Sequence, residues 1–164
     1  MNNKKYIFLD IDGPLITTRS MLAFGKFPNA DPVAISILKR IVEKNDANLI
    51  ISSSWRFGTE WRKDITKLLC DNGFSPSLCT GYLLDRTPTH LPSKLNKSIS
   101  RGDEIWAWML TMELHNLAPY TEYIIFDDDR DFFEWQPLLH VNRDIGLGIK
   151  EVELLKGFGW KFYG

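Results

Sequence analysis

Short apolar runs alternate with longer amphipathic segments along most of the chain. Three runs of aliphatic and aromatic residues, at 6–9, 49–51 and 123–126, have the composition of buried strands. Weaker runs at 78–84 and 138–141 are further strand candidates. Segments with apolar residues at helical spacing lie between these runs. This order predicts an α/β fold, a three-layer structure with a central parallel sheet flanked by helices.

Recognisable start signals precede two of the amphipathic segments. Asp31 stands before a proline, the pattern of a helix N-cap with proline in the first turn. Ser100 and Asp103 have the spacing of a capping box, in which two side chains satisfy free backbone donors reciprocally. Helices are predicted at residues 31–44, 59–72, 100–114 and 149–155.

Two connecting segments carry chain breakers and polar residues, and we expect irregular structure in both, at 14–30 and 85–100. The first of them also contains several large apolar residues. These suggest a flap packed over the mouth of a site at the end of the first strand. The apolar residues of this expected flap are Met21, Leu22, Phe24 and Phe27.

Composition favours one globular domain spanning residues 1–164. A content of 44% hydrophobic and 13% aromatic residues is ample for a core and excludes a disordered chain. The formal net charge of -1 gives no general attraction to nucleic acid or anionic membranes, so such a contact requires a local basic patch. The cysteines, Cys70 and Cys79, lack zinc-site spacing, and we find neither a signal peptide nor a membrane span. We therefore expect a cytoplasmic protein with free thiols.

Carboxylates directly follow two of the predicted strands. Asp10 and Asp12 come after the first, where Gly13 allows a sharp turn, and Asp127 and Asp128 follow the run at 123–126. Ligands of open parallel sheets bind at the carboxyl ends of the strands, and residues two apart on a strand share a face. If the two strands are neighbours, the acids form one cluster that requires a cation. Oxygen ligands suit Mg²⁺, and an aspartate in such a site can attack phosphorus. Otherwise the acids are only acidic loop ends.

The set of motifs resembles that of the haloacid dehalogenase (HAD) superfamily of phosphotransferases over nearly the whole chain. The resemblance implies that Asp10 is the nucleophile and that Asp12 is the general acid/base. It also implies a phosphoryl-binding hydroxyl after the second strand. Ser52 follows the apolar run directly and is the first choice; Ser53 is the second, because one residue of register decides which hydroxyl faces the site.

The remaining HAD motifs also have counterparts here. Arg101 matches the basic residue that neutralises the nucleophile and the phosphoryl group, and the start of the predicted helix adds partial positive charge there. The resemblance further implies an Mg²⁺ site. Its expected ligands are Asp10, Asp12, Asp127 and Asp128.

Three segments narrow the resemblance, namely 52–56, 101–108 and 126–129. They are similar to the HAD domains of Swiss-army-knife RNA-repair proteins and to the 3′-phosphatase domain of phage polynucleotide kinase–phosphatases. Those relatives remove phosphates from nucleic-acid ends. Pro14 stands where relatives usually have Thr or Val after the glycine. This departure bears on the geometry of the expected flap but not on the chemistry. No kinase P-loop occurs in the sequence, so only the phosphatase half of the bifunctional relatives has a counterpart.

The insertions between the motifs are too short for a large cap domain, and an uncapped site admits the end of a polymer. The segment after the predicted third strand is basic and is a candidate grip on a nucleic-acid backbone; it contains Arg86, His90, Lys94, Lys97 and Arg101. Trp55, alternatively a core residue, and Arg56 offer a stacking face for a terminal base. The expected substrate-binding residues are Gly13, Ser53, Arg56, Lys94 and Lys97.

The sequence thus predicts an Mg²⁺-dependent phosphatase that acts through an aspartyl-phosphate, with 3′-phosphorylated nucleic-acid ends as the preferred substrate. One alternative is a phosphatase of nucleotides or other small metabolites with the same chemistry. Another is a non-catalytic module that binds phosphate or a partner, although both Asp10 and Asp12 are present. A receiver domain also has an acidic pocket, but its phosphorylated Asp lies on a later strand than the first. A D-x-D nuclease is the last alternative; its metal cluster lacks a nucleophile, so a phosphoenzyme intermediate would exclude it. The oligomeric state and the participation of other repair enzymes stay open.

Overall fold

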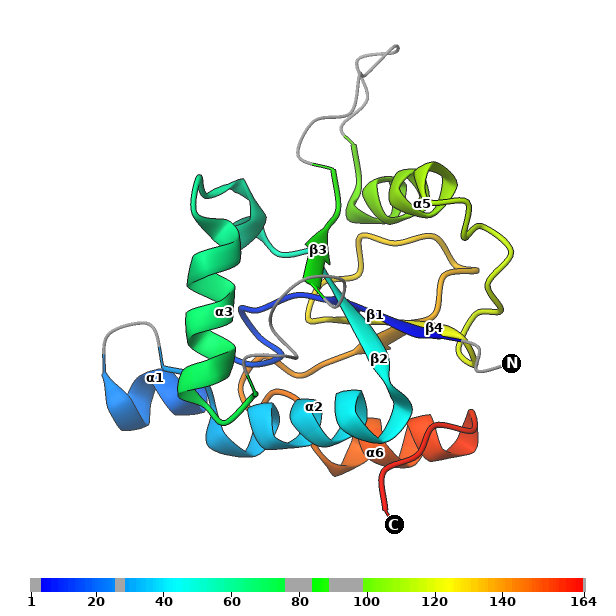
Figure 1. The fold of residues 1–164 in the computed structure, drawn as a ribbon. Helices are drawn as coiled ribbons and strands as arrows, with labels where there is room; N and C mark the ends of the chain where they lie inside the picture. The colour runs from blue at the N-terminus through cyan, green and yellow to red at the C-terminus, as the bar shows by residue number, and fades with distance from the viewer. Residues whose placement is uncertain (1–3, 26–28, 76–83, 89–98, 164) are drawn as a thin grey trace.

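Five parallel strands form one sheet in the computed structural model, in the order β3-β2-β1-β4-β5 (Figure 1). The structure describes residues 4–25, 29–75, 84–88 and 99–163. The central strand β1 lies between β2 and β4, with Leu9 paired to both Ile51 and Phe126. The residues that follow β1, β2 and β4 therefore emerge side by side at one edge of the sheet. The strands are β1 (Lys5–Leu9), β2 (Ala47–Ile51), β3 (Leu84–Arg86), β4 (Tyr123–Asp127) and β5 (Leu138–His140).

Helices cover both faces of this sheet and make the three layers that the sequence predicts (Figure 1). One core cluster joins Ile7 and Leu9 of β1 to helices α2, α3 and α6, whereas Phe8 points to the opposite face and packs with α5. Because successive side chains of a strand point to opposite faces, one short apolar run serves both cores. The helical elements are α1 (Thr18–Phe24), α2 (Pro32–Asn45), the 3₁₀ helix η1 (Ser54–Phe57), α3 (Trp61–Asp71), α5 (Arg101–Thr111) and α6 (Ile149–Gly157).

Both predicted helix starts are confirmed by the cap geometry. The Asp31 carboxylate accepts hydrogen bonds from Val33 N and Ala34 N at the start of α2. At the start of α5, Ser100 Oγ accepts from Asp103 N, while Asp103 Oδ2 accepts from Ser100 N. The second cap is important for the site because it fixes the direction of the residue that opens α5.

The segment after β1 is more regular than expected. It contains helix α1, which Thr17 caps by a reciprocal pair of hydrogen bonds with Ser20. The Thr17 hydroxyl also donates to Asp31, so the start of α1 is tied to the cap of α2. Met21, Leu22 and Phe24 are exposed, and the expectation that they pack over the site is therefore wrong; Phe27 lies outside the described residues.

The third strand also differs from its prediction. Most of the run at 78–84 lies outside the described residues, and β3 pairs with β2 through Leu84, Asp85 and Arg86, of which the last two were assigned to a loop. Polar residues are tolerated in this edge strand because they find partners: Asp85 accepts a hydrogen bond from Trp108 Nε1. Of the basic segment, His90, Lys94 and Lys97 lie outside the described residues, whereas Arg86 ends β3 and donates a hydrogen bond to Arg56 O at 2.7 Å.

Cys70 lies half-buried in α3, and Cys79 lies outside the described residues. In the parts of the chain that the structure describes, no helix is long and apolar enough to cross a membrane.

Candidate active site

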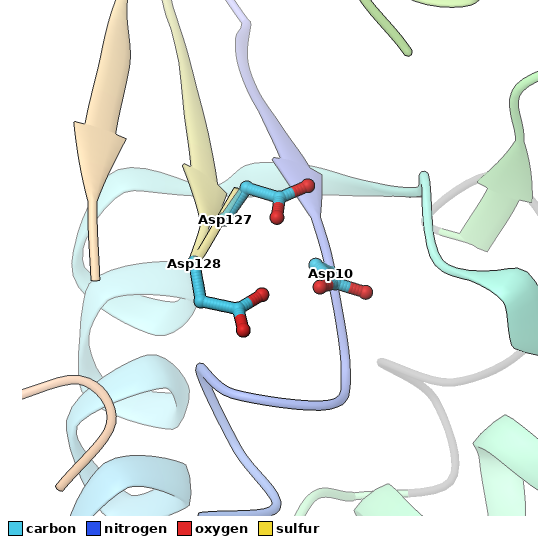
Figure 2. A group of neighbouring side chains, drawn as sticks. All are labelled: Asp10, Asp127 and Asp128. Atoms are coloured by element: carbon cyan, nitrogen blue, oxygen red, sulfur yellow. The ribbon is translucent and has the colours of Figure 1, made fainter. Parts of the chain in front are cut away.

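Three carboxylates from neighbouring strands converge at the carboxyl edge of the sheet (Figure 2). Asp10 follows β1, Asp127 ends β4, and Asp128 comes next, each offering an oxygen within 4.8 Å of the others. The acids border a cavity of about 410 Å³. Its lining residues are Asp10, Asp12, Ser54, Arg101, Asp127, Asp128, Asp129 and Arg143.

Burial and mutual repulsion make ionisation of this cluster unfavourable. Asp10 is only 5% exposed, and burial, followed by the charge of Asp127, raises its pKa from 3.8 to about 8 although Arg101 acts in the opposite direction. Burial also raises the pKa of Asp127, which is fully buried. A cation at this position removes the repulsion and restores the charged forms. The all-oxygen donor set fits Mg²⁺, which needs few protein ligands.

Arg101 is the cation that the protein itself places in the cluster. One of its terminal nitrogens lies 3.3 Å from Asp10 Oδ1 and 3.0 Å from Asp127 Oδ2. As the first residue of α5, it also lies where the free N–H groups of the helix add positive potential. The guanidinium therefore holds the two acids together and brings positive charge to the cavity.

The helix that carries Arg101 is anchored to the loop between β4 and β5. Gln136, which is buried, donates to Gly102 O at 2.9 Å and accepts from Phe133 N at 2.9 Å. A Cβ at Gly102 would lie 2.4 Å from Gln136 Oε1, so only glycine permits this close approach. The start of α5, which carries Arg101, is therefore held both by its own capping box and by the loop that contains Gln136.

Asp12 lies apart from the three clustered carboxylates. It is exposed, and its Oδ2 accepts a hydrogen bond of 3.3 Å from Trp55 Nε1. Gly13 makes the turn that separates the two acids: its φ is +105°, and a Cβ there would lie 2.6 Å from Asp128 Cγ. Asp12 therefore borders the same cavity with its side chain outside the group of three, an arrangement that suits proton transfer better than metal ligation through the carboxylate.

The serines after β2 have three different environments. Ser52 is buried, and its hydroxyl has no hydrogen-bond partner among the described residues. Ser53 caps η1, since its hydroxyl accepts from Trp55 N at 3.3 Å. Ser54, which the sequence analysis did not select, lines the acidic cavity. The Ser52 hydroxyl thus keeps an unused hydrogen-bonding capacity, but among the three serines only Ser54 lines the acidic cavity.

A family model described as "HAD domain in Swiss Army Knife RNA repair proteins" matches residues 6–152. The chain belongs to this HAD family. Membership confirms the predicted resemblance and supports a HAD-type phosphatase role in the context of nucleic-acid repair; HAD proteins generally use Mg²⁺, with which the buried aspartates are compatible. Neither the curated proteins nor the solved structures include a match to the chain.

Arg56 of this HAD domain lies beneath the site, not on its surface. The side chain is buried, donates to Ser52 O and Ser53 O at 3.0 and 2.9 Å, and forms an ion pair with Glu104 of α5. This placement corrects the expectation that Arg56 meets the substrate directly. The residue instead fixes the serine loop against the helix that carries Arg101. The other expected substrate contacts, Lys94 and Lys97, lie outside the described residues.

Arg143 is a second cation at the mouth of the cavity that the sequence analysis missed. Its Nε lies 3.5 Å from Asp128 Oδ2, and 72% of its side chain is exposed. The residue follows β5, so its position after a strand was the available signal. Asp129 has a supporting role, because its backbone N–H donates to Asp127 Oδ1 at 2.9 Å.

Proposed function

We propose that this HAD domain is an Mg²⁺-dependent phosphatase that removes 3′-phosphates from nucleic-acid ends through a phosphorylated Asp10. The observation that best supports the proposal is that the acidic residues of the site occupy two distinct positions. Asp10 and Asp127 share the guanidinium of Arg101, whereas Asp12 lies outside the cluster with a free path to the cavity. Nucleophilic attack and proton transfer require two such distinct carboxylates.

In the first step, an Asp10 oxygen forms a bond to phosphorus while the bond from phosphorus to the leaving oxygen breaks. Asp12 donates its proton to that leaving oxygen. Arg101, together with the unpartnered hydroxyl of Ser52, stabilises the charge on the phosphoryl oxygens.

In the second step, Asp12 accepts a proton from water as the water oxygen attacks phosphorus. The bond between phosphorus and Asp10 then breaks, which releases inorganic phosphate and regenerates the carboxylate. Asp10, Asp127, Asp128 and the Asp12 carbonyl would hold Mg²⁺, which supplies positive charge to the transferring group when bound.

The choice of a nucleic-acid end is supported by the family and by the access to the site. The described segment between β1 and α2 contains only helix α1 and no cap-sized insertion. The basic segment after β3 remains a candidate backbone grip, so Lys94 and Lys97 are part of the proposal. Other repair enzymes that produce the 3′-phosphorylated end or consume the dephosphorylated end are the expected functional partners.

A panel of phosphorylated substrates tests this function. Phosphate release is measured with Mg²⁺ from RNA and DNA oligonucleotides phosphorylated at the 3′ or the 5′ end, and from nucleoside monophosphates. We expect preference for 3′-phosphorylated oligonucleotides, an acid-labile phosphoenzyme on wild-type protein, and no turnover by the Asp10→Asn variant.

Each other outcome identifies a different function. Preference for mononucleotides would indicate a nucleotide phosphatase. Turnover by Asp10→Asn within about tenfold of wild type, equivalent to only about 1.4 kcal/mol in barrier, would refute the nucleophile assignment. No turnover of any substrate would identify a non-catalytic phosphate-binding module.

A further inference from the structure

A second hollow, of about 620 Å³, adjoins the acidic cavity at Ser54, which lines both. It lies between the loop at residue 29, η1 and the exposed side of α3. The side chains that matter for its chemistry are Asn29, Trp55, Asp64, Lys67 and Asn72. Its volume falls within the range of pockets for small organic ligands.

Trp55 connects this hollow to the proposed proton donor. Its indole N–H donates to Asp12 Oδ2 at 3.3 Å, and its side chain also lines the hollow. A group that leaves from phosphorus takes a proton from Asp12, so its oxygen lies near that carboxylate. The rest of the leaving group then lies next to Trp55 and can extend into the hollow.

The walls of the hollow indicate the class of leaving group. Trp55 offers an aromatic wall for a planar ring, while Asn29, Asn72 and Asp64 offer amide and carboxylate oxygens to hydroxyl and amino groups. The charge of Lys67 is engaged by Asp71, 2.7 Å away. Among the described lining residues, this leaves a net negative wall, which does not attract a second phosphate.

We propose that this hollow binds the nucleoside that carries the scissile phosphate. The inference rests on the proposed function and adds to it a site for the leaving group. A nucleoside supplies a planar base, sugar hydroxyls and ring or amino N–H groups without charge, which are the features that the walls complement. The nucleoside is either the last one of a strand or that of a free nucleoside 3′-monophosphate.

The kinetic test removes two polar groups from the hollow in an Asn29→Ala/Asp64→Ala variant. Its matched control, Glu60→Ala/Lys63→Ala, removes an exposed ion pair from the same end of α3, outside the hollow. Substrates are a 3′-phosphorylated oligonucleotide, a nucleoside 3′-monophosphate and acetyl phosphate, which is too small to fill the hollow.

We expect the hollow variant to raise KM for the nucleoside-containing substrates by about tenfold, a loss of about 1.4 kcal/mol in binding. Its KM and kcat for acetyl phosphate should stay within about twofold of wild type, as should all values of the control. A rise in KM for only one of the two nucleoside-containing substrates supports the site and shows whether it takes the last nucleoside of a strand or that of a free nucleotide. Equal behaviour of hollow variant and control on all three substrates would overturn the proposal.

A binding experiment separates failure of this inference from failure of the proposed function. Adenosine is titrated into ¹⁵N-labelled protein, and the indole N–H signal of Trp55 is assigned by its loss in Trp55→Phe. We expect a saturable shift whose apparent Kd rises about tenfold in the Asn29→Ala/Asp64→Ala variant. Binding without phosphatase activity would refute the proposed function alone. Phosphatase activity on nucleotides without an adenosine-dependent shift would refute the hollow as the nucleoside site.

Discussion

The Asp10→Asn variant should make the metal-free protein more stable, because the wild-type carboxyl is held where its charged form is unfavourable. Its pKa is about 8 in the folded protein and 3.8 ordinarily. Because the pKa is higher in the folded protein than in the unfolded chain, proton binding by Asp10 favours folding, and this contribution to stability is fully present below the ordinary pKa. That contribution is lost progressively as pH rises toward the folded value.

The size of the effect follows from these two pKa values. Each pKa unit corresponds to about 1.36 kcal/mol, so roughly three units between the ordinary pKa and pH 7 amount to about 4 kcal/mol. At pH 5, about one unit above the ordinary pKa, the same calculation gives only about 1–2 kcal/mol. An amide at position 10 does not ionise in this pH range, and its oxygen can still accept a hydrogen bond from Arg101. The variant should therefore exceed wild type in stability by an amount that grows from pH 5 to pH 8.

Urea unfolding of both proteins in excess chelator at pH 5, 7 and 9 measures this difference. Asp71→Asn is a suitable control, because Asp71 forms an exposed ion pair with Lys67 on the surface of α3, and the loss of such a solvent-screened pair should change stability little at any of these pH values. Mg²⁺ should stabilise wild type and have much less effect on Asp10→Asn. Equal stabilities of wild type and Asp10→Asn at pH 7, or a difference that shrinks as pH rises, would refute the electrostatic account.

Four further predictions concern the phosphate-binding groups, the buried ion pair, the glycine turn and the basic segment. Arg101→Ala should lower kcat on oligonucleotide and acetyl phosphate alike by about 10²–10³, and an effect confined to one substrate would contradict its role at the phosphoryl group. Arg56→Met should lower the free energy of unfolding by about 3 kcal/mol in urea, because it leaves the half-buried carboxylate of Glu104 and two backbone carbonyls without their partner; a loss below about 1 kcal/mol would contradict this. Gly13→Ala should weaken Mg²⁺ binding in calorimetric titration at least tenfold, since the new methyl overlaps the Asp128 carboxylate of the proposed metal site, and unchanged affinity would contradict that contact. Replacing Lys94 and Lys97 with Ala should reduce the salt slope of oligonucleotide KM by about 0.7 per phosphate contact, and an unchanged slope would show that neither lysine meets the backbone.

Continuous apolar runs made the central strands predictable, because a strand buried on both faces leaves a strong local signal. The acids at their ends were equally accessible to sequence reasoning. Once β1 and β4 are neighbours, Asp10, Asp127 and Asp128 have to meet, and the structure brings them together. Arg101 was accessible because the Ser100 capping box marks the start of its helix.

Other features depend on contacts between distant segments, which local patterns do not encode. Arg56 was expected at the surface, but its burial depends on Glu104, 48 residues further along the chain. Helix α1 forms where breakers suggested a loop, since Thr17 gains both a cap and a bond to Asp31. Ser54 borders the cavity while Ser53 turns to cap η1, a distinction that requires the direction of the backbone after β2.

The ion pair between Arg56 and Glu104 has a consequence for how such domains diversify. It connects the serine loop to the start of α5, and so sets the separation between the groups that we propose to bind the phosphate. Loops between these two points can then gain or lose residues without disturbing that separation, as long as α3 keeps its place in the core and β3 its pairing with β2. We expect relatives to vary in length mostly within residues 57–100 and to exchange positions 56 and 104 only as a pair. An engineer who transplants a new substrate loop into this domain should insert it there and leave both anchors intact.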